Sequence, residues 1–253
     1  MKNKKVFLLS EKNLFSEHIK MCLLNDLLEV ESGEKFDFKE DPNVTIINLI
    51  GKIDLVLKQI NKILRSSTQK IILIENGLDL YLNSENEIPF SVYSKMIPKN
   101  EICKILLDVE NRILESKKNH VIFRTSEVYG ISSPQCNIEK LLFAKNEIEF
   151  ENSTHDFIYD GDVINAIEIA LRKDVTGIFD IASGISIQMR QVAEIIKKIR
   201  NIEFDIKWKR KNLKIVFNCE NFKYYKWEPL VNLETGLKTL LALRRRYGKL
   251  QST

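Results

Sequence analysis

The chain has 253 residues, of which 44% are hydrophobic, and its formal net charge is +4. This length allows one domain with a large core and a small appended lobe, and so mild a charge does not imply a nucleic-acid partner. The four cysteines lie far apart without metal-ligand spacing, which predicts reduced thiols and no metal site. The apolar run at Val6–Leu9 is too short for a signal peptide, and no stretch approaches a membrane span. We therefore expect a cytoplasmic protein without a membrane partner.

Apolar runs and amphipathic stretches alternate along the first half of the chain. We expect buried strands at Lys4–Leu9, Val44–Ile50, Lys70–Ile74 and His120–Arg124, and helices at Leu14–Leu28, Ile53–Leu64 and Pro98–Ser116. The residues of the first helix expected to face the core are Leu14, Phe15, Ile19, Leu23, Leu24 and Leu27. Residues 29–43 are expected to hold one possible strand around Phe36, and residues 76–92 a loop. The alternation predicts an α/β fold, a doubly wound parallel sheet of the Rossmann-like kind.

Residues 155–184, HDFIYDGDVINAIEIALRKDVTGIFDIASG, form the most informative stretch of the second half. We expect an extended run at His155–Tyr159, a helix whose start is marked by Asp160 and Asp162, a stop at Gly177 and a strand at Ile178–Ile181. This stretch is assigned with residues 1–130 to the Rossmann-like domain. The less regular segments, 131–154 and 185–253, are expected to form a small mixed C-terminal lobe with helices at Gln188–Arg200 and Leu233–Tyr247.

Three stretches resemble the NAD-dependent epimerase/dehydratase family, the extended short-chain dehydrogenases that act on nucleotide sugars. The run DFIY, DVINAIEIAL, FDIASG within residues 155–184 is similar to the family's RDF(V/I)Y, DVAxAIxxAL and NIGSG. Val121–Gly130 resembles the family's (I/V)xLRxxNVYG, and KWEP at residues 226–229 with LETGLKTL at 233–240 resembles its LGWxPxxxLEEGLxxT ending. The resemblance covers most of residues 119–242, and residues 1–118 only by pattern. It implies NAD or NADP as a possible cofactor, a nucleotide sugar as a possible ligand, and a homodimer.

The glycine-rich cofactor loop of that family, TGxxGxxG, has no counterpart here. Ser10, Asn13 and Ser16 occupy the three glycine positions, and no glycine precedes Gly33. Glycines there let the backbone approach the pyrophosphate on the helix N-terminus, so weak or absent NAD(P) binding is expected. Two readings stay open, namely a loop that only caps the helix and a remodelled phosphate loop. Glu31, about 20 residues past Ser10, and Asn48 are the other residues assigned to this site. The segment before Val44 is also short for the family, which predicts a trimmed strand–helix pair.

The family's catalytic Tyr-x-x-x-Lys pair is also missing, because none of the seven tyrosines has a lysine four residues later. The resemblance aligns Lys99 with the lysine of that pair. It thereby places Lys95 where the tyrosine belongs, with Tyr93 two residues earlier. The serine or threonine position falls on Asn76 or Gly77. If the protein is active, Lys99, Lys95 and Tyr93 are the candidate catalytic residues.

Substrate contacts implied by the resemblance are only partly kept. His155 replaces the arginine of the RDF motif, Arg210 aligns with a second arginine, and Glu127 replaces the asparagine of NVYG. Neutral histidine is a weaker partner for a diphosphate than arginine, and a carboxylate opposes one. Trp208, beside Arg210, is expected in the core.

Two functions remain open at the level of the sequence. One is a divergent member of the nucleotide-sugar epimerase/dehydratase family, in surface-polysaccharide sugar-nucleotide metabolism, with its redox machinery degraded. The other is a non-catalytic ligand-binding, partner or regulatory protein on the same fold. For the homodimer, helices Ile53–Leu64 and Pro98–Ser116 carry apolar residues on more than one face. These are Leu55, Val56, Ile60, Ile63, Ile102, Ile105, Leu106, Val109 and Ile113.

Overall fold

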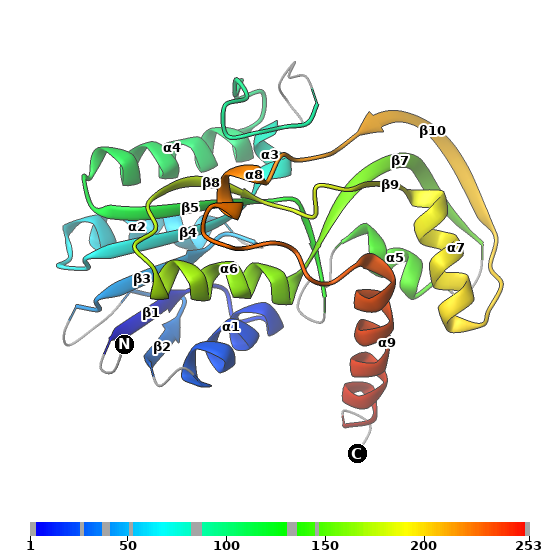
Figure 1. Cartoon of the computed structure of the whole chain (residues 1–253), viewed down its shortest axis with the longest axis horizontal. Coiled ribbons are helices and arrows are strands. Elements are labelled where there is room, and N and C mark those ends of the chain that lie inside the picture. The colour runs from blue at the N-terminus through cyan, green and yellow to red at the C-terminus, as the bar shows by residue number, and fades with distance from the viewer. Residues whose placement is uncertain are drawn as a thin grey trace.

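A six-stranded parallel sheet forms the main body of the computed structural model, which describes residues 4–25, 28–36, 41–50, 53–81, 88–130, 136–144 and 147–250 (Figure 1). Its strand order is β2-β1-β3-β4-β5-β8. The strands are β1 Lys5–Leu9, β2 Glu29–Gly33, β3 Val44–Asn48, β4 Lys70–Asn76, β5 Asn119–Thr125 and β8 Gly177–Ile181. All neighbouring strands run parallel. The predicted doubly wound α/β fold is confirmed.

Helices cover both faces of this sheet. Helices α1 Leu14–Asn25 and α6 Asp160–Arg172 pack on one face, and α2 Asp54–Arg65 and α4 Glu101–Glu115 on the other (Figure 1). Strand alternation sends Val6 and Leu8 to the first face, and Phe7 and Leu9 to the second. Burial on both faces explains why the central strands read as continuous apolar runs in the sequence.

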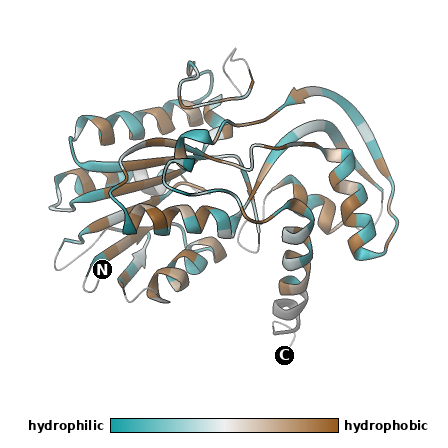
Figure 2. Ribbon diagram, viewed as in Figure 1, coloured by the Kyte–Doolittle hydropathy of each residue, from teal (hydrophilic) through white to brown (hydrophobic). Residues whose placement is uncertain are grey.

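A second, four-stranded sheet builds the small lobe. In it β7 Ile148–Tyr159 pairs in parallel with β6 Glu127–Tyr129 and β10 Ile206–Lys214, and antiparallel with β9 Ser186–Gln188. Helices α5 Asn137–Leu142, α7 Met189–Arg200 and α9 Leu233–Leu250 cover it. Trp208, which the sequence predicted in the core, is partly buried and packs against the core of this lobe, with its ring centroid 6.2 Å from that of Phe150. Figure 2 shows β10 as mostly hydrophilic, and β10 is an outer strand of its sheet.

The chain returns to the main body after β10. Helix α8 Glu220–Lys223 lies beside β8, and Phe222 and Trp227 are fully buried in the same core cluster as β5 and α6. Residues 219–227 therefore pack with the Rossmann-like sheet, although the sequence assigned 185–253 to the lobe.

Several predicted element boundaries were wrong. The early strand is β2 at Glu29–Gly33, and Phe36 lies beyond it as a buried residue. Leu14 and Leu24 are about half exposed, whereas Phe15, Ile19 and Leu23 are buried; Leu27 lies outside the described residues. The predicted loop after β4 begins with a short helix, α3 Gly77–Tyr81. Helix α6 ends at Arg172, so Gly177 opens β8 and does not stop the helix.

The faces predicted for dimerisation are less apolar than expected. Helix α4 buries one face, made by Cys103, Leu106, Val109, Glu110 and Ile113. On its exposed side, Ile102 and Leu114 are 44% and 37% exposed among charged neighbours. The side chains of Leu55 and Val56 lie outside the described residues. In the part of the chain that the structure describes, no helix is long and apolar enough to cross a membrane.

Candidate functional site

The crevice of a doubly wound sheet lies where neighbouring strands lead off in opposite directions. Here β1 connects to β2 on one side, and the chain then returns to place β3 on the other side of β1. The carboxyl ends of β1 and β3 therefore mark the position at which such folds bind dinucleotides. Ser10 follows β1 and Asn48 ends β3, and Asn48 Nδ2 donates a hydrogen bond of 3.1 Å to Ser10 Oγ. Both residues are buried, so the crevice is bridged by the protein's own side chains.

The N-terminus of α1 is also occupied by local side chains. Asn13 Oδ1 accepts the N–H of Ser16 at 2.9 Å, and Ser16 Oγ accepts the N–H of Asn13 at 3.1 Å. The N–H of Ser10 donates to the carbonyl of Gly33 on the neighbouring strand. Helix N-termini bind phosphate through free N–H groups, and these three are already satisfied. The structure thus brings Ser10, Asn13, Ser16 and Asn48 together, with Asn13 as the cap of α1.

A cavity of about 360 Å³ lies outside this loop. It is lined by Ser10, Lys12, Ser16, Glu17, Lys20, Ser32, Gly33 and Glu34. Glu31 is exposed and does not line it, and Glu34 is the acidic residue that follows β2 at the cavity wall. Glu31 lies within β2 next to the lining residue Ser32, and alternation along the strand turns the two side chains to opposite faces.

The residues proposed as catalytic lie outside helix α4. Asn100 caps that helix by accepting the N–H of Cys103 at 2.7 Å, so the helix begins at Glu101 and not at Pro98. Tyr93, Lys95 and Lys99 fall in an irregular segment, and all three side chains are exposed, Tyr93 by 90%. Lys95 and Lys99 therefore do not lie on the helix that the sequence predicted at Pro98–Ser116 or on an extension of it.

A buried ionic cluster occupies the centre of the sheet below that segment. Arg124 of β5 grips Glu110 of α4 with two hydrogen bonds, from Nε and Nη2, of 2.7 and 2.6 Å. Its Nη1 donates to the hydroxyl of Tyr81 at 3.3 Å, and that hydroxyl donates to Asp180 of β8 at 2.7 Å. Glu75 of β4 lies with its Oε1 3.9 Å from Arg124 Nε. Three carboxyl groups thus surround one guanidinium group.

Burial sets the protonation of this cluster. Desolvation, with the nearby charge of Glu110, raises the pKa of Glu75 well above its ordinary range. Desolvation also raises the pKa of Asp180 to about 7, and the Tyr81 hydrogen bond only partly offsets it. Burial beside Asp180 raises the pKa of Tyr81, so this phenol stays protonated and does not act as a base. In the sequence, this cluster is indicated by one charged residue inside each of the apolar strands β4, β5 and β8. The sequence prediction did not include it.

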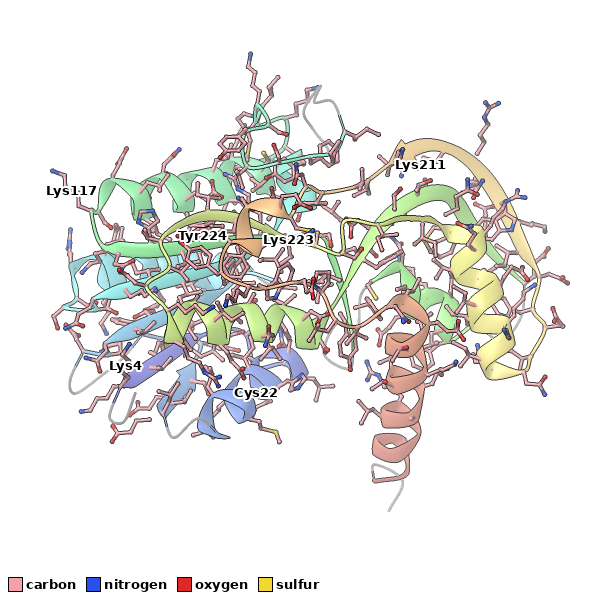
Figure 3. All side chains as sticks on the ribbon, in the orientation of Figure 1. Lys4, Cys22, Lys117, Lys211, Lys223 and Tyr224 are labelled. Atoms are coloured by element: carbon pink, nitrogen blue, oxygen red, sulfur yellow. The ribbon has the colours of Figure 1, made fainter. Side chains whose placement is uncertain are left out.

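The small lobe holds a second cavity, of about 400 Å³, between β6, β7, α5 and β10. Glu127 and His155 both line it, as the resemblance implies, and Glu127 Oε2 lies 2.9 Å from His155 Nδ1. Arg210 is exposed and does not line the cavity, while its neighbour Lys211, which Figure 3 labels on β10, does. Strand alternation explains why Lys211 lines the cavity and Arg210 does not, because adjacent residues of β10 point to opposite faces. Ser153, which sequence reasoning missed, also lines the cavity.

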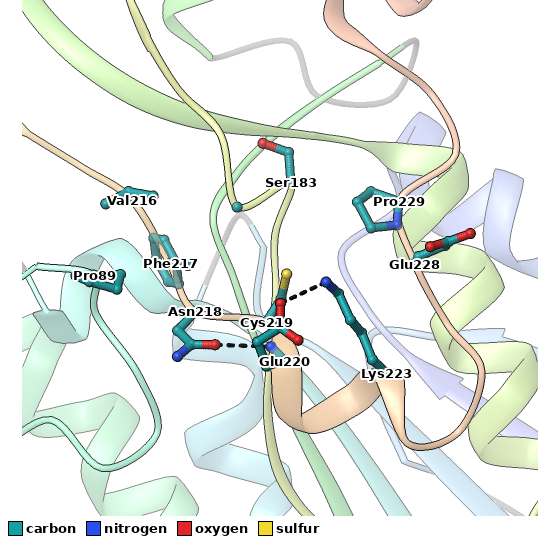
Figure 4. Close-up of a pocket in the computed structure, with 11 residues that line it drawn as sticks. Pro89, Ser183, Val216, Phe217, Asn218, Cys219, Glu220, Lys223, Glu228 and Pro229 are labelled. Carbon is teal, nitrogen blue, oxygen red and sulfur yellow. Dashed lines mark hydrogen bonds and ion pairs between the residues drawn. The ribbon is translucent and has the colours of Figure 1, made fainter.

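A third cavity, of about 530 Å³, lies where the chain returns to the main body (Figure 4). Ser183, Gly184 and Phe217 line it, and all three donate hydrogen bonds to the carboxylate of the fully buried Asp156. Cys219 also lines it, and burial raises the pKa of its thiol, which makes it a poor nucleophile. The polar atoms beneath this cavity form the hydrogen bonds that connect the small lobe to the main sheet.

Comparison with known proteins identifies the fold. No family model matches the sequence, and no curated protein matches it. Among solved structures, UDP-N-acetylglucosamine 4-epimerase from Methanobrevibacter ruminantium, in complex with UDP-N-acetylmuramic acid, is similar with a TM-score of 0.80. It is 16% identical, and the match covers 98% of this chain and 100% of that one.

Two further solved structures agree. UDP-glucose 4-epimerase from Thermotoga maritima, with UDP-glucose, has a TM-score of 0.76 at 15% identity, covering 96% of this chain and 99% of that one. GDP-mannoheptose C4 reductase from Campylobacter jejuni, with NADP bound, has a TM-score of 0.78 at 12% identity, covering 97% and 99%. Over nearly its whole length, this chain has the fold of the NAD(P)-dependent nucleotide-sugar epimerases and reductases.

Proposed function

We propose that this protein is a divergent relative of the nucleotide-sugar epimerases and dehydratases that takes a nucleotide sugar while its redox machinery is degraded. We place it in the cytoplasm, in sugar-nucleotide metabolism for surface polysaccharides, as a homodimer. The resemblance of residues 119–242 and the fold shared with enzymes of that class support this assignment.

The observation that carries the proposal is the closed loop between β1 and α1. Its N–H groups donate to Asn13, Ser16 and Gly33, and the Ser10–Asn48 hydrogen bond spans the crevice. A pyrophosphate that accepted these N–H groups would displace the side-chain oxygens of Asn13 and Ser16, and the buried Ser16 hydroxyl would lose a hydrogen bond at a cost of about 1–3 kcal/mol. NAD(P) binding is therefore weak or absent.

The helix that would carry the catalytic pair supports the same conclusion. Helix α4, whose sequence is EICKILLDVENRILE, contains no tyrosine, and its buried polar residue, Glu110, is held by Arg124. The phenol nearest in sequence to β4, Tyr81, is buried and hydrogen-bonded to Asp180. No side chain described here combines access to a substrate with the role of the family's tyrosine.

Calorimetric titration tests the proposal. NAD⁺, NADH and NADPH are expected to bind with dissociation constants no tighter than about 1 mM, and one of a panel of UDP-, dTDP- and GDP-sugars to bind about tenfold tighter or better. Replacing Asn13 and Ser16 together by glycine removes the competing side chains and is expected to strengthen NAD⁺ binding. Glu31→Ala is the matched control, because Glu31 is exposed outside the cavity.

Each outcome bears on the assignment. A micromolar dissociation constant for NAD⁺ in the wild type would show that the loop argument is wrong. Binding of a nucleotide sugar without turnover would favour the alternative, a non-catalytic binding protein on the same fold. Absence of binding to every nucleotide sugar would contradict the proposal itself.

A further inference from the structure

Strands β6 and β7 place three polar side chains in one line on the cavity of the small lobe. Ser153 and His155 are two residues apart on β7, so both project from the same face of that strand. Glu127 of β6 pairs with Phe157, two residues beyond His155, which brings its side chain alongside. All three residues line the cavity of about 400 Å³.

Each ring nitrogen of His155 contacts one of the other two side chains. Ser153 Oγ lies 2.6 Å from His155 Nε2, and Glu127 Oε2 lies 2.9 Å from His155 Nδ1. A hydroxyl on one ring nitrogen and a carboxylate on the other is the arrangement by which serine nucleophiles are activated. The contact between Nδ1 and Glu127 lies within ion-pair distance but lacks the alignment of a hydrogen bond.

The neighbours of these three residues fix their positions. The His155 ring stacks on Phe157, with centroids 5.6 Å apart and planes 18° from parallel. Asn137 donates to Glu127 twice, from its N–H to Oε1 at 2.7 Å and from Nδ2 to Oε2 at 3.2 Å. Stacking on Phe157 and the two hydrogen bonds that hold Glu127 keep the His155 ring oriented toward Ser153. A serine hydroxyl that only needed a hydrogen-bond partner for stability would not require a histidine held in this way.

We propose that Ser153, His155 and Glu127 form a nucleophilic triad that cleaves short acyl esters in the small-lobe cavity. Ser153 Oγ attacks the ester carbonyl while its proton passes to His155 Nε2. The C–O bond to the leaving alcohol then breaks, and the alcohol takes that proton. Water hydrolyses the acyl-serine by the same two transfers, which releases the carboxylic acid and restores Ser153.

The cavity fits such a substrate. Leu78, Leu213 and Ile215 give it an apolar side for the acyl chain, and the charged part of its lining carries both signs, with Lys211 paired to Glu151. Ser153 and His155 are catalytic residues in this scheme, and Glu127 is a positioning residue that acts through the imidazole. No step uses a dinucleotide, so the proposal stands independently of NAD(P) binding.

The test combines a covalent probe with turnover of 4-nitrophenyl acetate. A fluorophosphonate probe is expected to label the wild type at Ser153, located by peptide mass spectrometry. Ser153→Ala is expected to abolish labelling and to lower turnover at least about 100-fold, and His155→Gln to lower turnover similarly. Thr154→Ala is the matched control, because the neighbouring hydroxyl projects to the opposite face of β7, and it is expected to retain wild-type turnover.

The positioning role of Glu127 has its own readout. Glu127→Gln is expected to lower kcat about tenfold or more without raising KM, and Glu127→Asp to recover part of the loss. Thermal unfolding of each variant shows whether it remains folded. Absence of fluorophosphonate labelling at Ser153 in the folded wild type would overturn the proposal, and so would turnover that survives Ser153→Ala.

Discussion

At the scale of single residues, the family-like residues Asp156 and Asp162 hold together segments that lie far apart in the sequence. The Asp156 carboxylate accepts hydrogen bonds from Ser183, Gly184 and Phe217, and the Asp162 carboxylate accepts the N–H groups of Leu230 and Val231. The resemblance predicted the architecture, and the structure places Tyr93, Lys95 and Lys99 in the irregular segment before α4.

The buried cluster around Arg124 gives a pH dependence of stability. Asp180 has a pKa of about 7 in the folded protein because it is buried, whereas an exposed aspartate titrates near 3.9. The folded state therefore takes up a proton at pH 5 that the unfolded state does not hold. This contribution is complete below the unfolded pKa and disappears as the pH rises through about 7.

Replacing Asp180 by asparagine is expected to remove this contribution while keeping an acceptor for Tyr81. Relative to the variant, the free energy of unfolding of the wild type should fall by roughly 2 kcal/mol between pH 5 and pH 8. Urea unfolding at four pH values measures the difference. Asp205→Asn, at an exposed aspartate, is the control. An unchanged difference between wild type and Asp180→Asn across this range would contradict the assignment.

At the scale of elements, the sequence located strands and long helices but misplaced their ends. Apolar runs such as Lys70–Ile74 and His120–Arg124 were read correctly because burial on both faces leaves a continuous signal. Ends depend on single hydrogen bonds, and the cap from Asn100 to Cys103 moved the start of α4 past Pro98. Helix α3 was missed because Asn76, which binds the N–H of Leu78 and the Asp79 side chain, reads as a loop residue.

Helix α9 is fitted to the small lobe through a glycine. A Cβ atom on Gly236 would lie 2.1 Å from the hydroxyl oxygen of Tyr129, whose side chain is buried. Gly236→Ala is therefore expected to destabilise the protein by roughly 1–3 kcal/mol, although alanine favours helix by about 1 kcal/mol. Thermal unfolding compares it with Thr239→Ala, an exposed site on the same helix, which should change little. A variant at Gly236 as stable as the wild type would show that the close approach of α9 to Tyr129 is absent in solution.

At the scale of the whole molecule, the candidate site shows what a sequence pattern leaves out. Ser10, Asn13 and Ser16 were assigned from the resemblance to the family's glycine-rich loop, and the structure gathers them with Asn48 at one crevice. The line of Ser153, His155 and Glu127 depends on the register between β6 and β7. The Arg124 cluster depends on the pairing of β4, β5 and β8, which lie far apart in the sequence. Sequence periodicity carries neither kind of information.

The outer faces of α2 and α4 bear on assembly. Exposed residues of α2 include Lys58, Lys62 and Arg65, and exposed residues of α4 include Glu101, Lys104, Asp108 and Glu115. Within α4, Glu101 pairs with Lys104 and Asp108 with Arg112, so Glu115 is left as an acidic partner for the basic residues of α2 across a two-fold axis, with Ile102 and Leu114 available for apolar contact. The homodimer stays a prediction that rests on a small apolar surface and few charge pairs.

Light scattering at micromolar concentration is expected to give twice the monomer mass at low salt, with dissociation as salt screens the charge pairs. Ile102→Glu inserts a charge into the predicted contact and is expected to give a monomer. Leu24→Glu is the matched control, because Leu24 is 46% exposed on α1, on the opposite face of the sheet from α4. It should leave the dimer intact. A monomer mass for the wild type at low salt would rule the dimer out, and equal effects of the two substitutions would move any dimer contact away from α4.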